Sequence, residues 1–185
     1  NRDWAFARHQ RARQLVAADA SAPIAWYVLG FSHLAAAKAG VIAREGPLQP
    51  PGVSHEAAAG RAFIRALEQD STMVEAATAL ALVPRPREGS KETAQWLPML
   101  RRYREVIPGP ARYAAAKTER EAGNVARSIE WLESAEHAGA VSAGAVALEQ
   151  ARSLHALGRD AEGAKIYFEG AADTSQAGRA AYLSE

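Results

Sequence analysis

The chain of 185 residues contains no cysteine, which excludes disulfide bonds, thiol catalysis and thiolate metal sites. It also has no uninterrupted apolar run near the roughly 20 residues of a membrane helix, so we expect no membrane insertion. No signal peptide is evident, and because Asn1 is not an initiator methionine we expect a processed or excised piece of a longer protein. These absences leave the compartment open between the cytoplasm and a bacterial cell envelope.

An excess of one charge is missing as well. The formal net charge is +1, which gives no general reason to expect nucleic acid or an anionic membrane as a partner. Two basic runs are interpreted as solvated helix faces that do not bind nucleic acid; they contain Arg8, Arg11 and Arg13, and Arg101, Arg102 and Arg104.

Catalytic and metal-binding motifs are also lacking. The sequence contains no G-x-S-x-G, no phosphate loop and no dinucleotide fingerprint. The five histidines are scattered without the i, i+4 spacing or nearby carboxylates of a metal-binding helix; they are His9, His33, His55, His137 and His155. His55-Glu56 begins like the HExxH motif but continues with three alanines. We therefore expect no enzyme activity, no metal and no cofactor.

What the chain does have is alanine. Its residues are 48% hydrophobic and 23% charged, which is typical of a folded domain, and much of the apolar content is alanine while β-branched residues are sparse. Alanine is the best helix former and lets helices approach closely. We expect one all-α domain over residues 1–185. The arginine- and alanine-rich, lysine-poor composition suggests a GC-rich bacterial source.

Helical periodicity runs almost from end to end and predicts about ten antiparallel helices and no strand. A proline-rich insertion at about 41–53 interrupts the pattern, because its prolines and glycines cannot continue a helix. The expected helices are 3–18, 22–40, 54–69, 72–83, 90–106 with a kink at Pro98, 110–122, 125–138, 141–157, 160–172 and 174–184. The four tryptophans are expected in the core; they are Trp4, Trp26, Trp96 and Trp131.

The glycines indicate an internal repeat. Gly89, Gly123 and Gly158 lie about 34 residues apart, and Gly40 precedes them by one such period plus the length of the insertion. This period is typical of tetratricopeptide repeats. The family's W-x2-L-G pattern is matched, with His33 replacing the following tyrosine, by Trp26, Leu29 and Gly30. Its A-x3-F pattern is matched at 59–63.

The chain thus resembles the tetratricopeptide family over about 23–172, which implies an α-solenoid of about four helix pairs with flanking half-repeats. In that family the first helix of each pair lines a concave groove. The resemblance places the following residues there: Ile24, Tyr27, Phe31 and Leu34; Tyr113, Lys117 and Arg120; and Leu148, Arg152 and His155. The groove would be aromatic and apolar at one end and basic at the other, with Lys117 beside Arg152.

Such a groove favours a protein-interaction module or scaffold that binds a peptide with hydrophobic anchors and an acidic group. The asparagines of the family's carboxylate clamp are missing, which argues against recognition of chaperone tails. Tyr27 and Phe31 could instead pack under the 41–53 insertion. Two other functions remain: a docking or regulatory region of a larger enzyme or sensor, and a structural subunit that stacks end to end through its terminal helices.

Overall fold

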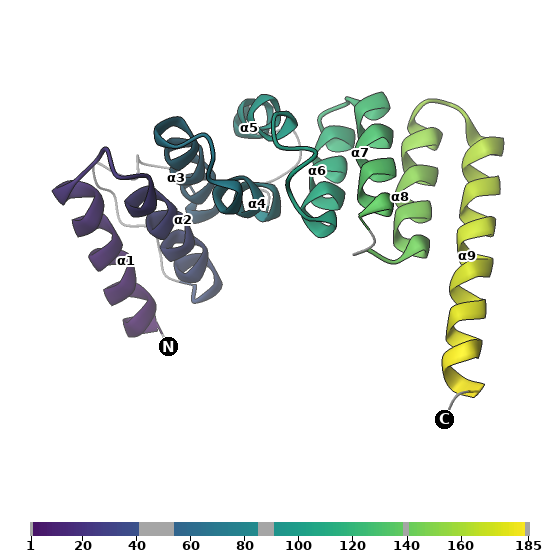
Figure 1. The fold of residues 1–185 in the computed structure, drawn as a ribbon, viewed down its shortest axis with the longest axis horizontal. Helices are drawn as coiled ribbons and strands as arrows, with labels where there is room; N and C mark the ends of the chain where they lie inside the picture. Colours follow the sequence, from purple (N-terminus) through teal and green to yellow (C-terminus); the bar gives the residue numbers. More distant parts are fainter. Residues whose placement is uncertain (1, 41–53, 85–90, 139–140, 184–185) are drawn as a thin grey trace. The chain divides into compact units, whose positions relative to one another are not determined.

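The computed structural model describes residues 2–40, 54–84, 91–138 and 141–183, and it confirms the all-α class. Within these ranges the chain forms nine helices and no strand (Figure 1). They are α1 (Arg2–Ala18), α2 (Pro23–Lys38), α3 (His55–Gln69), α4 (Val74–Leu82), α5 (Lys91–Arg101), α6 (Gly109–Glu121), α7 (Val125–His137), α8 (Ala143–Ala156) and α9 (Asp160–Leu183). No helix in the described ranges is long and apolar enough to cross a membrane. The 41–53 insertion lies outside them.

Two predicted boundaries are wrong. The expected helices 160–172 and 174–184 form the single helix α9, because neither glycine nor proline interrupts the chain between them. α5 contains Pro98, as expected, but ends at Arg101 and gives way to turns. Tyr103, in these turns, is buried and donates its hydroxyl proton to the carbonyl of Ser71. Tertiary packing therefore ends α5 earlier than its sequence pattern predicts.

The chain divides into two compact units, unit 1 (Asn1–Tyr103) and unit 2 (Arg104–Glu185). In unit 1, α2 packs between α1 and α3, and α4 and α5 continue from α3. In unit 2, α7 packs on α6 and α8, while α9 packs on α8. Sequence neighbours thus pack side by side in each unit, which is compatible with a helical repeat.

Small residues set the spacing between helices in unit 1. Three alanines, Ala12, Ala25 and Ala62, form one core cluster with Val16 and Leu29, and Trp26 packs at its edge. Gly30 of α2 faces the ring of Phe63 in α3 so closely that a Cβ on the glycine would lie 2.4 Å from a ring carbon. The close spacing of α2 and α3 therefore depends on the missing side chain at position 30.

The glycines that indicated a repeat do end helices. α6 is followed by Gly123 with φ +81° and α8 by Gly158 with φ +72°, a left-handed conformation that glycine adopts without strain. Serines begin two of the helices: Ser54 and Ser142 accept hydrogen bonds from the backbone N–H of Ala57 and Ala145. Gly89 lies outside the described residues.

The tryptophans are not all in the core. Trp96 and Trp131 are buried, and Trp26 is partly buried. Trp4 is exposed, with the guanidinium of Arg8 4.5 Å from the centre of its ring. The prediction that Trp4 is a core residue was wrong, because the face of α1 that packs on α2 is formed by the smaller Ala5, Ala12 and Val16.

Candidate functional site

An apolar stripe runs along the exposed side of α2 in unit 1. Ile24, Val28 and Phe31 are 56%, 38% and 42% exposed, and their spacing of four and three residues places them on one face of the helix. Tyr27 and Leu34 of the predicted groove are partly buried beside them. The sequence analysis missed Val28, although its spacing from Ile24 could have identified it.

Aromatic rings anchor this stripe to α3. The ring of Phe31 lies edge-on to Tyr27 and to Phe63, with centroids 5.0 and 5.3 Å apart, and Tyr27 also lies 6.0 Å from Phe63. Burial raises the pKa of Tyr27, and the carboxylate of Glu75 on α4 raises it further. The stripe is therefore a fixed surface of rings and aliphatic side chains whose phenol stays neutral at physiological pH.

The predicted groove residues of unit 2 surround a buried carboxylate that the sequence analysis missed. Glu149 of α8 is fully buried. Its Oε1 accepts a hydrogen bond of 2.6 Å from Arg120 Nε on α6, and its Oε2 accepts one of 3.2 Å from Arg152 Nη1. Tyr113 lies close to the same charges: burial raises its pKa, Glu149 raises it further, and the two arginines lower it.

The remaining predicted residues of this face differ in their surroundings. Lys117 is partly buried on α6, between Tyr113 and Arg120 along one helix face, and forms no ion pair with a described residue. Leu148 is partly buried on α8. His155 is exposed and lies 2.5 Å from the carboxylate of Asp160 at the start of α9. The predicted placement of Lys117 beside Arg152 stays a prediction.

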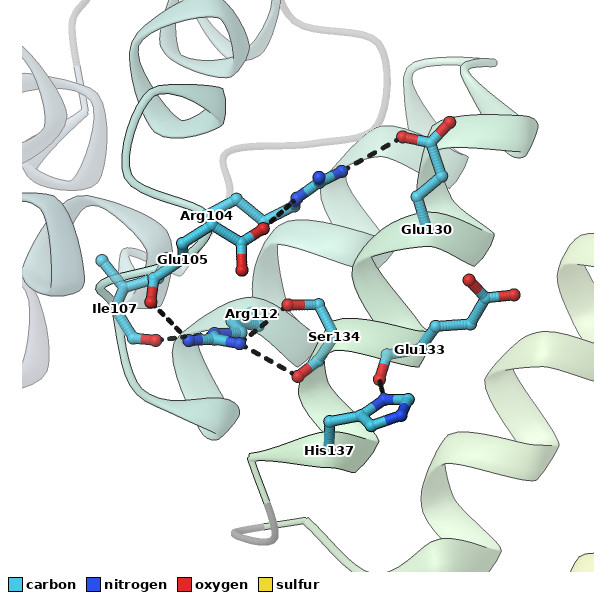
Figure 2. Close-up of polar contacts among 8 residues, drawn as sticks. All are labelled: Arg104, Glu105, Ile107, Arg112, Glu130, Glu133, Ser134 and His137. Carbon is cyan, nitrogen blue, oxygen red and sulfur yellow. Dashed lines mark hydrogen bonds and ion pairs between the residues drawn. The ribbon is translucent and has the colours of Figure 1, made fainter.

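A polar hollow of about 570 Å³ lies between the turn that precedes α6 and the outer side of α7 (Figure 2). Arg112 of α6 holds this region together. It donates hydrogen bonds to the carbonyl oxygens of Glu105, Ile107 and Ser134, and to the hydroxyl of Ser134. Because its guanidinium donates to all four of these acceptors, Arg112 links the turn before α6 to α6 and α7.

The other charges around the hollow are mostly paired with one another. Arg104 bonds Glu105 at 2.9 Å and Glu130 at 3.3 Å, as Figure 2 shows. His137 donates from Nδ1 to the backbone carbonyl of Glu133. Arg104 lies in the turns that follow α5 and not on a solvated helix face as expected. With Glu130 it links this turn to α7, a contact that their separation of 26 positions does not reveal.

Three histidines that the sequence analysis called scattered lie together inside unit 1. His9 of α1, His33 of α2 and His55 at the start of α3 are buried, and their ring centroids are 4.4 to 5.6 Å apart. A hydrogen bond of 3.0 Å joins Nδ1 of His33 to Nδ1 of His55. We call these three residues the histidine cluster. The proximity of these three rings corrects the expectation that all five histidines are scattered.

Two rings of the histidine cluster, those of His9 and His33, are held neutral by their surroundings. Burial lowers the pKa of His9 to about 4, and His55 and Arg13 lower it as well. Burial likewise lowers the pKa of His33 to about 3, with contributions from the other two histidines and Arg13. No group of histidine and carboxylate side chains in the described ranges is arranged to hold a metal ion.

The two units thus present surfaces of different chemistry. The α2 stripe in unit 1 offers rings and aliphatic groups, whereas α6 and α8 in unit 2 offer cations around a buried carboxylate. Each surface is formed by helices that keep it rigid. No family model matches this chain, and no curated protein matches it either.

Proposed function

We propose that this protein is an interaction module that binds a segment of another protein, with the α2 stripe as the principal contact. The observation that carries the proposal is the row of exposed apolar side chains at Ile24, Val28 and Phe31. Aromatic groups in a rigid setting supply much of the binding energy of protein interfaces, because little entropy is lost when they are covered. Phe31 is fixed in this way by Tyr27 and Phe63.

We further propose that the helix pairs are tetratricopeptide-like repeats stacked as an α-solenoid. The close approach of Gly30 to Phe63 supports this, since both residues match the repeat pattern. So does the contact between α6 and α8, the first helices of two successive pairs. The left-handed Gly123 and Gly158 lie one period apart at equivalent connections. In such an arrangement the first helices share one surface.

The partner segment would carry hydrophobic anchors for unit 1 and an acidic group for unit 2. Arg120 and Arg152 already bond Glu149. Lys117 has no such commitment to a described residue and is the cation best placed to pair with an acidic group. Charges of this kind fix the direction of a bound segment more than they add to its affinity.

The test uses a displayed peptide library selected on the wild-type protein. The selected peptides should combine aromatic or aliphatic residues with an acidic residue. Their affinity should fall at least about tenfold in Phe31→Ala, and the dependence on the acidic residue should be lost in Lys117→Ala. Trp4→Ala is the matched control, because Trp4 is an exposed aromatic residue on α1 and not on the stripe.

Circular dichroism must show the same helicity in all variants. Selected peptides that bind wild type, Phe31→Ala and Trp4→Ala equally well would contradict the assignment of the α2 stripe. An equal loss of peptide affinity in Phe31→Ala and Trp4→Ala would show that binding does not depend specifically on the α2 stripe. The interpretation as a docking region of a larger enzyme uses the same surface and predicts the same result.

Self-association through the terminal helices is a second candidate function. Phe168 of α9 is 70% exposed, and Trp4 and Phe6 of α1 are exposed as well. An open hollow of about 490 Å³ beside α1 is lined partly by Val16 and Trp26. End-to-end stacking would cover such groups. It predicts that mass measured by sedimentation rises with concentration and that Phe168→Ser abolishes the rise, whereas a constant monomeric mass contradicts it.

A further inference from the structure

We propose that the histidine cluster is an acid-sensitive latch, which holds α1 on α2 and α3 at neutral pH and releases it in mild acid. The proposal is independent of the proposed function, because the cluster lies in the interior of unit 1. Each of the three helices contributes one imidazole, so the cluster spans the contact that α1 makes with the rest of the unit.

The hydrogen bond between His33 and His55 requires that at least one of the two rings is neutral. Ser32 donates its hydroxyl proton to the carbonyl of Leu29, so its oxygen accepts the Nδ1 proton of His9 at 3.0 Å. The Nδ1 atoms of His33 and His55 are 3.0 Å apart, and a hydrogen bond between them needs one atom with a proton and one without. If both rings were protonated, two N–H groups and two positive charges would face each other.

Charges near the cluster increase the cost of protonation. Arg13 lies one turn beyond His9 on α1 and acts on both His9 and His33. His55 also lowers the pKa of His9, and His9 and His55 lower the pKa of His33. Among the described residues, α2, α3 and the packed helices α4 and α5 supply no carboxylate that offsets this effect on either ring. A proton that enters the cluster therefore has to be accommodated in a buried setting with the Arg13 guanidinium nearby.

The direction of the pH effect follows from the lowered pKa values. Exposed histidine binds a proton near pH 6.5, whereas His9 and His33 in the packed unit do so only near 4 and 3. The released state therefore binds more protons, and the packed state loses stability as the pH falls below 6.5. Each of these two histidines lowers the ratio of packed to released α1 by about tenfold per pH unit in this window.

Release of α1 would uncover an apolar surface. Ala25 and Leu29 of α2 and Ala62 of α3 form the core cluster with Ala12 and Val16 of α1. These groups are buried while α1 is packed. The latch thus couples a change in pH to the exposure of hydrophobic surface on α2, next to its exposed stripe.

The test is segment-resolved amide hydrogen exchange of the intact chain at pH 7 and pH 5, corrected for intrinsic exchange rates. Protection of α1 should fall on the order of several hundredfold between the two values, while protection of α6 to α8 stays constant as an internal reference. In His9→Gln, which stays uncharged at both pH values and can still bond Ser32, the fall in protection should be about twentyfold smaller than in the wild type. His155→Gln is the matched control, since this exposed histidine of unit 2 should not change the result.

A second measurement does not depend on any variant. Titration of the histidine ring protons by NMR should show His9 and His33 neutral at pH 5.5 while α1 stays packed. Constant protection of α1 from pH 7 to 5 would overturn the proposal, and so would an equal fall in wild type and His9→Gln. Titration of both rings near pH 6.5 in a fully protected α1 would overturn it as well.

Discussion

At the scale of single residues, the buried carboxylate of Glu149 assigns different roles to the two arginines that bind it. Arg120 is mostly buried, with 25% of its side chain exposed, whereas 54% of the Arg152 side chain is exposed. A charge that loses its partner inside a protein is costly, but an ion pair in solvent contributes little. The sequence analysis treated both arginines as groove cations and could not distinguish them.

We therefore predict that Arg120→Met lowers the free energy of unfolding by about 3 kcal/mol. Arg152→Met, the matched change at the exposed partner, should lower it by less than about 1 kcal/mol. Denaturant unfolding followed by circular dichroism measures both values. Equal losses would show that Glu149 is not stabilised mainly by Arg120.

Gly30 offers a second prediction at this scale. A methyl group at this position would overlap the ring of Phe63, so Gly30→Ala should cost about 1 to 3 kcal/mol even though alanine favours helices. The double variant Gly30→Ala/Phe63→Leu should lose less than the sum of the two single changes, because leucine leaves room for the methyl group. Thermodynamic additivity in this cycle would argue against a direct clash.

Several residues of the candidate site could be predicted from sequence, and others could not. Ile24, Tyr27 and Phe31 were expected on one helix face because they match the groove positions that the resemblance to tetratricopeptide repeats implies. The histidine cluster was not expected, because His33 and His55 are 22 positions apart and meet only when three helices pack in register. Glu149 likewise looks like an ordinary polar helix residue until α6 covers it.

At the scale of helices, local chemistry predicted some boundaries and not others, because the expected caps Ser21 and Thr72 do not cap α2 and α4. Ser54 was expected as a helix cap from its side chain, and the structure confirms it. The end of α5 depends on tertiary contacts of Tyr103, which no local pattern contains. The expected boundary near position 173 is absent from α9, because no glycine or proline stops the helix there even though Asp173 and Thr174 are weak helix formers.

The caps lead to a third prediction. Ser142→Ala should destabilise the protein by about 1 kcal/mol, because the backbone N–H of Ala145 loses its acceptor at the start of α8. Ser142→Asp keeps an acceptor and should retain most of the stability. Thermal unfolding of the three proteins checks this order, and an aspartate variant as unstable as the alanine variant would rule out a capping role.

At the scale of the whole molecule, the division into two compact units has consequences for unfolding. Trp4, Trp26 and Trp96 lie in unit 1, while Trp131 is the tryptophan of unit 2. Their four indole N–H groups therefore report on each unit separately in an NMR spectrum. Stability in helical repeats is a sum of local terms and interactions between neighbours, so a change in one unit acts mainly there.

We predict that Gly30→Ala shifts the denaturation midpoint of the three unit 1 indole signals by more than that of Trp131. Arg120→Met should have the opposite pattern. Denaturant titration with NMR detection of the indoles provides the measurement. Four signals that shift together in both variants would show that the chain unfolds as one cooperative body.

The length of α9 has a consequence for its dynamics. α9 has 24 residues and α8 has 14, so at about 1.5 Å per residue α9 is longer by about 15 Å. Gly170 already lies against Ala147 and the carbonyl of Ala143, near the start of α8, and Figure 1 shows α9 continuing beyond this point. A helical segment of about ten residues is marginal in water without a packing surface. A contact that covers the last turns of α9 would therefore stabilise this part of the helix.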